Sequence, residues 1–386
     1  MLLPHWMNGV VSYRRMAILA LAVVMTIGTH AALITEARAQ GSALPTVNPG
    51  DGPQGRMIAF VLQAQPEAVN PAAMQEQISG LLPADMGSVR DFVDPNIPAS
   101  EGEAASIIGR TQEAFPMVEG AVPALFRVYD VPILMVPVAV PVPRQEFAAA
   151  WQARRQFAEA PEILSSHQGH TIIFALVDPQ TTAEQVRAAE ALSAVVAAMA
   201  TGSTNVLGVH WSSADLSIPP GAFVNAFQKT NAEATAALAD SKPVRPVWHQ
   251  LITMWIDIDA VTAPLFQQAY AAAEPDAVPA WVPEGSVGLI TRGLASFIGR
   301  EIEMAPSDRP PNEQALALVH VIAYLLDRGQ LFREGDTLGF GEERLIEASL
   351  RDSSALIGGS AETAEAVKIL RLTYRLVEEG EAQSLQ

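Results

Sequence analysis

The sequence predicts an α+β protein with a mixed β-sheet, whose helices pack mainly on one face. Three observations lead to this class. Strand-like and helix-like segments alternate irregularly along the 386 residues, one pair of segments reads as a hairpin, and hydrophobic residues make up 49% of the chain. The irregular order and the hairpin argue against a doubly wound parallel sheet, and the hydrophobic content is enough for a large buried core.

The first residues read as a signal peptide. Arg14 and Arg15 precede the uncharged run Met16–Gly28, and Ala37–Ala39 fits a small-x-small cleavage site. We therefore expect residues 1–39 to be removed during export, which predicts a periplasmic protein.

The segment after the cleavage site, residues 40–55, is rich in glycine and proline and is expected to be a flexible linker. The alternative to cleavage is an anchor, because Met16–Ile34 has no charge and nearly the length that spans a bilayer. Contact with a membrane is expected only if this signal is not cleaved.

Residues 56–170 are expected to form an N-terminal α/β half. The expected elements are a strand at Met57–Gln65, a helix at Pro71–Leu82, an extended segment at Phe126–Pro143, and helices at Arg144–Ala160 and Pro161–Gly169. Asn70 and Pro71 have the pattern of a helix start. Segment 131–143 is apolar, but prolines cannot donate to a β-ladder, so we expect an edge strand, a bulged strand or an extended arm.

Residues 171–352 are expected to form a C-terminal α/β half, followed by a C-terminal helix and tail in residues 353–386. The expected strands are His170–Val177, Asn205–Trp211, Trp248–Val261 and a hairpin within Ser286–Ala305 that turns at Gly299. The expected helices are Thr182–Gly202, Pro220–Leu238, a buried helix at Asn312–Gly329, and Ala361–Glu379 with Ser360 as its N-cap.

The two halves resemble each other in one respect. Residues 57–82 and 171–196 both show a strand, a short turn and a helix at similar spacing. An internal duplication is one interpretation, and the chance similarity of any two strand–helix units is the other.

Composition excludes several classes of function. The chain has 24 basic and 42 acidic residues, and loss of residues 1–39 leaves 21 and 41, a net charge of −20. Such a surface repels phosphate backbones, so we expect no binding of nucleic acid. There is no cysteine, which excludes disulfides and thiolate chemistry. No G-x-S-x-G elbow is present, and the glycines of Phe332–Glu343 lack the lysine of a phosphate loop, so no cofactor is expected.

The histidines are the first candidates for a site. His167 and His170 are three residues apart, directly before an apolar run. They are either two ligands of a metal ion or the polar edge of a helix-to-strand corner, and two rings alone supply too few ligands for zinc. His320 lies in an apolar helix pattern, and is expected to be a core histidine unless it completes a three-histidine site with this corner.

Two acids form the second candidate. Glu301 and Glu303 would point to the same face of a strand, where paired carboxylates can do acid–base chemistry or ligate a metal, or can simply be solvated. Trp281, in a proline-rich loop, is a candidate anchor for a protein partner, as is the segment 131–143; packing against the sheet is the alternative for Trp281.

The order of several segments resembles the bacterial proteins grouped as domain of unknown function 4261. The segments are VPILMVPVAVPVPRQEF, SSHQGHTIIFALV, NVLGVHW, GLITRGLASFIGREIEM and REGDTLGFGEE. The resemblance covers roughly residues 57–350 and is most specific over residues 286–340. It implies no catalytic residues, because no activity is established for the group, and it implies that GLxxFGxxExE and GDTxG are structural turn motifs. In this sequence Ile298 stands at the second glycine of the first motif, and Gly299 follows it.

From the sequence we therefore expect an uncharacterised exported protein that is a non-enzymatic periplasmic binding or interaction module. The alternative is a metal-dependent hydrolase or another enzyme that uses His167 and His170, with Glu301 and Glu303 as further ligands. If these four residues converge in one pocket, the enzyme is favoured. If they are scattered, the binding module is favoured.

Overall fold

The computed structural model describes residues 57–82, 103–142, 160–239, 249–271, 282, 284–329, 332–339, 344–351, 356 and 368–376. The predicted signal peptide, the linker and Trp281 lie outside these residues. None of the helices in the described ranges is long and apolar enough to span a bilayer.

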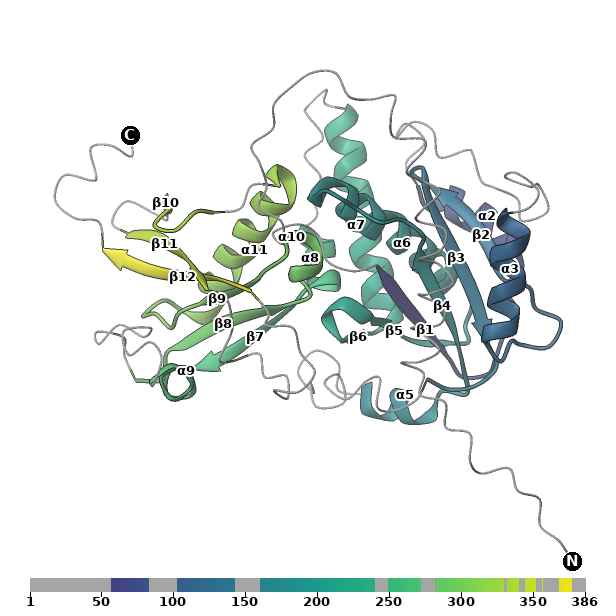
Figure 1. Ribbon diagram of the computed structural model, residues 1–386, viewed down its shortest axis with the longest axis horizontal. Coiled ribbons are helices and arrows are strands. Elements are labelled where there is room, and N and C mark those ends of the chain that lie inside the picture. The colour runs from purple at the N-terminus through teal and green to yellow at the C-terminus, as the bar shows by residue number, and fades with distance from the viewer. Residues whose placement is uncertain are drawn as a thin grey trace, which may run out of the picture.

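The first half of the described chain builds a six-stranded sheet that is antiparallel throughout (Figure 1). Its strands are β1 (Ile58–Gln63), β2 (Ala124–Val128), β3 (Val131–Val138), β4 (Gly169–Ala175), β5 (Val206–Trp211) and β6 (Leu216–Ile218). Their order across the sheet is β2-β3-β4-β1-β5-β6. Alternate residues of each strand therefore face two different layers of helices.

The helices of this half are α2 (Pro71–Leu81), α3 (Glu103–Ala114), α5 (Ala160–Ser166), α6 (Thr182–Gly202) and α7 (Pro220–Ala239). One sheet face belongs to the main core and lies against α2, α6 and α7; the other belongs to two smaller clusters with α3 and α5. Helix α6 begins with a capping box between Thr181 and Glu184. Six of its eight alanines are fully buried, and small side chains allow other helices to approach it closely.

The second half builds a mixed six-stranded sheet with the order β10-β11-β12-β9-β8-β7. Its strands are β7 (Asp257–Thr262), β8 (Val287–Arg292), β9 (Glu301–Met304), β10 (Thr337–Gly339), β11 (Arg344–Arg351) and β12 (Ile369–Leu376). Only the pair β9–β12 is parallel among these. Its helices are α8 (His249–Trp255), α9 (Ala263–Tyr270), α10 (Ala295–Ile298) and α11 (Pro311–Arg328).

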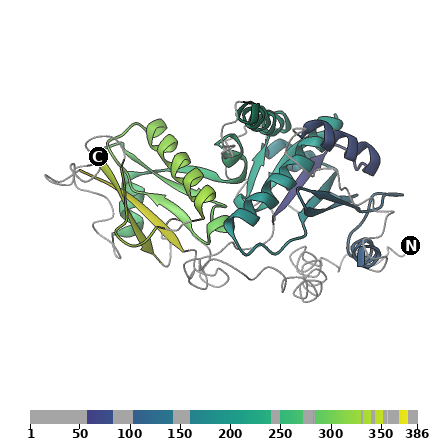
Figure 2. The ribbon, with the colours of Figure 1, turned by 90° about the horizontal axis from the view of Figure 1, so that it is seen from above.

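One continuous core joins the two sheets. The rings of Trp211 and Trp255 stack with centroids 6.4 Å apart, and Trp255 stacks on Phe297 at 5.7 Å. The Trp255 indole N–H donates to the Ser193 hydroxyl on α6 over 2.9 Å. Figure 2 shows the two sheets side by side with helices between them. The two halves are therefore packed against each other through buried aromatic rings, and not only linked by the chain.

The structure confirms the predicted α+β class, with two open sheets in place of one. The predicted boundary after His170 falls inside β4, and the two sheets divide the chain between β6 and β7. The two similar units, β1–α2 and β4–α6, lie in the same sheet, where β1 and β4 are antiparallel neighbours.

The predicted C-terminal helix is wrong where the structure describes it, because β12 is a strand paired with both β9 and β11. Leu370, Leu372 and Tyr374 face the main core, and Arg371 and Thr373 alternate with them. This alternation of period two is the strand pattern, and burial between two neighbouring strands outweighs the helix propensity of leucine and arginine. In the same way, the strand predicted over residues 248–261 begins only at Asp257, after the helix α8.

The proline-rich segment was expected to be an edge strand, a bulged strand or an extended arm. Its part in β3 is none of these, since β3 lies between β2 and β4 and pairs with both without a register shift. The carbonyl of Pro132 accepts from the N–H of Leu176, just past the end of β4. The carbonyl of Pro137 accepts from Val118, where β2 no longer reaches. The N–H and C=O of a strand residue point to the same side. Each proline therefore lacks its N–H on a side where the neighbouring strand has already ended, and no hydrogen bond between strands is lost.

Candidate functional site

His167 and His170 both bind the stretch of chain that follows β3. The Nε2 atom of His167 accepts the N–H of Val142 over 2.8 Å, while its Nδ1 lies 3.1 Å from the carbonyl of Leu164. The Nδ1 atom of His170 lies 2.8 Å from the carbonyl of Val140. These contacts fix the proton of each ring on Nδ1.

The two rings are buried, and burial lowers the pKa of each. The pKa of His170 falls from 6.5 to about 4, chiefly through loss of solvent, and burial also lowers the pKa of His167. Neutral rings can ligate a metal, but both nitrogens of His167 are occupied by backbone groups. Only Nε2 of His170 has no hydrogen-bond partner, and it is fully buried. The two histidines thus hold residues 140–142 in place through hydrogen bonds to the backbone.

Glu301 accepts four hydrogen bonds at the turn between β8 and β9. Its carboxylate accepts the backbone N–H groups of Gly293, Leu294 and Ala295 at 2.7–3.1 Å and the hydroxyl of Thr291 at 2.7 Å. The same hydroxyl accepts the N–H of Ile302, so its single hydrogen is directed at Glu301. Burial raises the pKa of Glu301, and the four donors oppose this shift. With four donors around two oxygens, the carboxylate has little capacity left for a metal.

Glu303 lies on the same face of β9 as predicted, but it has a different set of partners. Its carboxylate contacts the hydroxyl of Tyr270 on α9 and the guanidinium of Arg371, which is 3.3 Å away on β12. The Arg371 guanidinium also lies 4.3 Å from the centre of the Tyr270 ring. Glu303 and Arg371 are 0% and 2% exposed, so this is a buried ion pair that joins β9, β12 and α9.

The four predicted ligands therefore do not converge. His170 lies in β4 of the first sheet and His167 directly before that strand, whereas Glu301 and Glu303 lie in β9 of the second sheet. His320 is exposed on α11, so the prediction of a core histidine is wrong, and it does not join the corner. Within the described ranges, no three of the residues His, Cys, Asp and Glu are placed to hold a metal ion together.

Sequence reasoning missed a third histidine with two polar neighbours. His210 on β5 lies opposite Ser217 on β6, with its Nδ1 3.2 Å from the hydroxyl, and its Nε2 is 3.5 Å from the Asp215 carboxylate. The three residue types are those of a hydrolase triad. However, burial lowers the pKa of His210 to about 3, which makes it a poor base, and Ser217 is its direct cross-strand neighbour. The order His210, Asp215 and Ser217 within one short stretch of the sequence could have indicated this group.

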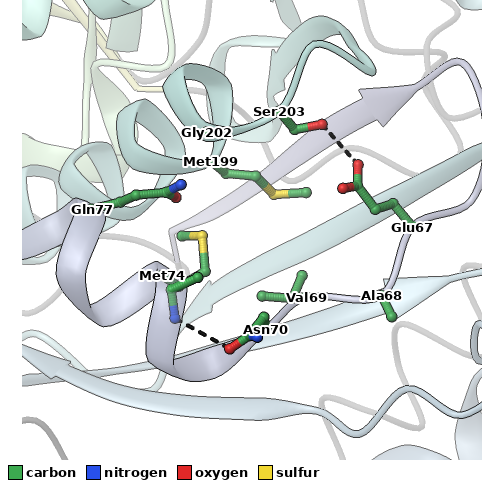
Figure 3. Close-up of a pocket in the computed structure, with 10 residues that line it drawn as sticks. Glu67, Ala68, Val69, Asn70, Met74, Gln77, Met199, Gly202 and Ser203 are labelled. Carbon is green, nitrogen blue, oxygen red and sulfur yellow. Dashed lines mark hydrogen bonds between the residues drawn. The ribbon is translucent and has the colours of Figure 1, made fainter.

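An open pocket lies where the loop after β1 meets the end of α6. Figure 3 shows it between the start of α2 and the last turn of α6. The walls carry the carboxylate of Glu67, the amide of Gln77 and the thioethers of Met74 and Met199, and the cavity is about 130 Å³. No residue of this lining was predicted as a site, because its two parts, residues 67–77 and 199–203, are far apart in the chain and none belongs to a catalytic or ligand-binding motif.

The local sequence explains the shape of this pocket. Asn70 caps α2 by accepting the N–H groups of Ala72 and Ala73, which fixes the turn that carries Glu67. Gly202 ends α6 without a side chain, and a Cβ there would lie within 2.4 Å of the Gln77 amide. Glycine at this position therefore lets the Gln77 side chain lie directly against the last turn of α6.

The described chain is thus an α+β protein with two packed sheets, in which the buried acids and histidines have structural partners. Residues 290–361 match the family described as domain of unknown function (DUF4261). This match confirms the resemblance seen in the sequence for the part of the chain that includes the Glu301 turn, α11, β10 and β11. No curated protein and no solved structure gives a significant match.

Proposed function

We propose that this protein is exported to the periplasm and acts there as a non-enzymatic binding module, and that the pocket between α2 and α6 holds its ligand. The observation that carries this proposal is the pocket itself. Polar groups from Glu67, Gln77 and Ser203 surround a space that is open to solvent. A concave site with a few polar groups on an apolar wall is the general form of a small-ligand site.

The contrast with the buried polar residues supports binding over catalysis. The carboxylate of Glu301 and both nitrogens of His167 are used to hold backbone. An acid or base in catalysis must be able to reach a substrate and exchange a proton with it. Export is supported by the pattern of residues 1–39 alone, and the role of Trp281 in binding a partner stays a prediction.

The first experiment is to express the full chain with its own N-terminus and determine where the periplasmic protein starts. A start at or near Gln40 is expected. A chain that keeps residues 1–39 and remains in the membrane fraction would contradict the export part of the proposal, and would leave the pocket to be tested separately.

The pocket is tested by a ligand screen on the exported protein, with thermal unfolding as the readout. Ala73 lines the pocket from the exposed side of α2, so Ala73→Leu fills it without a change of charge. Ligands of the pocket should raise the midpoint of the native protein and lose this effect in the variant. Gln75→Leu, an exposed position on the same helix outside the lining, is the matched control. If neutral, anionic and cationic compounds all fail to bind, the pocket is not a ligand site.

A further inference from the structure

We infer that the pocket between α2 and α6 selects a small organic cation, an ammonium group with a short apolar body. This inference rests on the proposed function, because it names the ligand class of the same site. Three features of the described residues lead to it: an acid with a free oxygen, the carbonyl end of a long helix, and a wall of thioethers.

Glu67 supplies the negative charge. Its Oε2 atom accepts the hydroxyl of Ser203 over 2.7 Å and the amide of Asn205 over 3.3 Å. Both bonds go to one oxygen, and Figure 3 shows the other directed toward the middle of the pocket. Glu67 is the single charged side chain among the residues that line the pocket, so there is no basic group at the site to compete for it.

The end of α6 adds to the negative potential. The last carbonyls of a helix have no partner within it and carry a partial negative charge of about half an elementary charge. Here the N–H of Ser203 satisfies the carbonyl of Met199, and the last turn of the 21-residue helix contains no basic residue. The end of α6 and the carboxylate therefore attract the same sign of charge. The start of α2 has the opposite partial charge, but the Asn70 side chain already accepts two of its free N–H groups, from Ala72 and Ala73.

The remaining wall suits the body of such a cation. Met74 and Met199 bring polarisable thioethers to the pocket, and Val69 adds an apolar surface. A cavity of about 130 Å³ has room for only a few heavy atoms. A short alkylammonium can place its charged head at Glu67 and its methylenes against the methionines.

The test uses the mature exported protein with ¹³C-labelled methionine methyl groups. The probe is n-butylammonium, compared with n-butanol and butyrate, which have similar chains but no positive charge. Butylammonium should shift the methyl signals of Met74 and Met199 in a saturable way, and it should bind at least about fivefold more tightly than either control. Addition of salt should weaken binding, because the site is open and the charges are screened.

Glu67→Gln removes the charge and keeps the shape, and it should weaken binding of butylammonium about tenfold, which corresponds to one charge-assisted hydrogen bond. Glu76→Gln makes the same change of net charge on an exposed position of α2 outside the lining, and it should leave binding unchanged.

Two results would overturn parts of the argument separately. If butanol or butyrate shifts the same methyl groups as strongly, or if Glu67→Gln binds normally, the pocket binds ligands but does not select cations. If none of the probes and no compound of the wider screen shifts Met74 and Met199, the cation inference and the proposed ligand site both fail.

Discussion

His167, His170 and Glu301 each form hydrogen bonds to a neighbouring stretch of backbone. The histidines hold residues 140–142 beside β4, and Glu301 holds the turn before α10. A buried polar group without a partner costs about 1–3 kcal/mol, so such residues strongly determine which local conformation is stable. These side chains therefore hold the segments that they contact in one arrangement.

The buried histidines predict a pH dependence of stability. The pKa of His170 is about 4 in the folded protein and 6.5 in the unfolded chain. Between these two pH values the unfolded state therefore binds more protons than the folded state. The free energy of unfolding should have its full value above about pH 6.5. It should fall as the pH is lowered toward 4, by up to about 1.4 kcal/mol per pH unit for each such histidine.

Chemical denaturation of His170→Asn at pH 7.0, 5.5 and 4.5 checks this. The asparagine amide can keep the donation to Val140 but does not titrate, so the variant should show a shallower loss of stability with acid. His320→Asn, at a histidine on the exposed face of α11, is the matched control for the change from histidine to asparagine. Equal slopes for all three proteins would show that His170 does not carry the effect.

Glu301→Gln tests the turn. In the variant, an NH₂ group replaces one carboxylate oxygen of Glu301. The backbone N–H groups that donated to this oxygen would then face another donor and lose their acceptor. We expect the free energy of unfolding to fall by about 2–3 kcal/mol in urea denaturation. Glu313→Gln, which removes a partly exposed ion pair with Arg309 in the first turn of α11, should cost less than about 1 kcal/mol. A small effect for Glu301→Gln would mean that the turn is held by its packing alone.

At the scale of elements, two glycines have opposite roles. Gly169 begins β4, and a Cβ there would lie 2.7 Å from the backbone of Pro66. Gly80 lies near the end of α2, and a Cβ there would meet nothing within 4 Å. The first glycine allows the loop after β1 to cross the start of β4, and the second only lowers the stability of its helix.

The pair Gly169→Ala and Gly80→Ala separates these roles. Gly169→Ala should destabilise the protein by about 1–3 kcal/mol, because a backbone atom must move. Gly80→Ala should stabilise it by up to about 1 kcal/mol, since alanine restricts the unfolded chain and favours helix. Thermal unfolding followed by circular dichroism gives both signs in one experiment. If both variants change the midpoint in the same direction, the close approach at Gly169 is not a constraint.

At the scale of the whole molecule, the shared core predicts that the two sheets unfold together. Trp255 stands at their junction, stacked on Trp211 from the first half and Phe297 from the second, with its N–H on Ser193. Trp255→Phe removes this donor and leaves a gap, which should cost about 2–3 kcal/mol. Leu316→Ala, at a side chain 58% exposed, should change the stability by less than about 0.5 kcal/mol.

For the native protein, far-UV circular dichroism and tryptophan fluorescence should give the same midpoint of unfolding. For Trp255→Phe the two probes should again agree with each other, at a lower midpoint than that of the native protein. Two separate transitions in the native protein would show that the sheets are independent domains.

The sequence determined what depends on neighbours along the chain. It predicted the α+β class, the helices that begin at Pro71 and Thr182, Asn70 as the cap of the first, and the alternation that puts Glu301 and Glu303 on one face. It also carried the resemblance to the family that residues 290–361 match. Each of these follows from the period of a helix or strand, or from a short motif, and those are local properties.

Only the tertiary structure decided the partners of the polar side chains and the division into two sheets. A histidine in a corner looks the same in the sequence whether it faces a metal or the backbone of residue 142. The β12 segment becomes a strand because β9 and β11 lie on both sides of it, and the pocket forms because Glu67 and Ser203 meet across 136 residues. These are contacts between distant parts of the chain, and spacing in the sequence does not encode them.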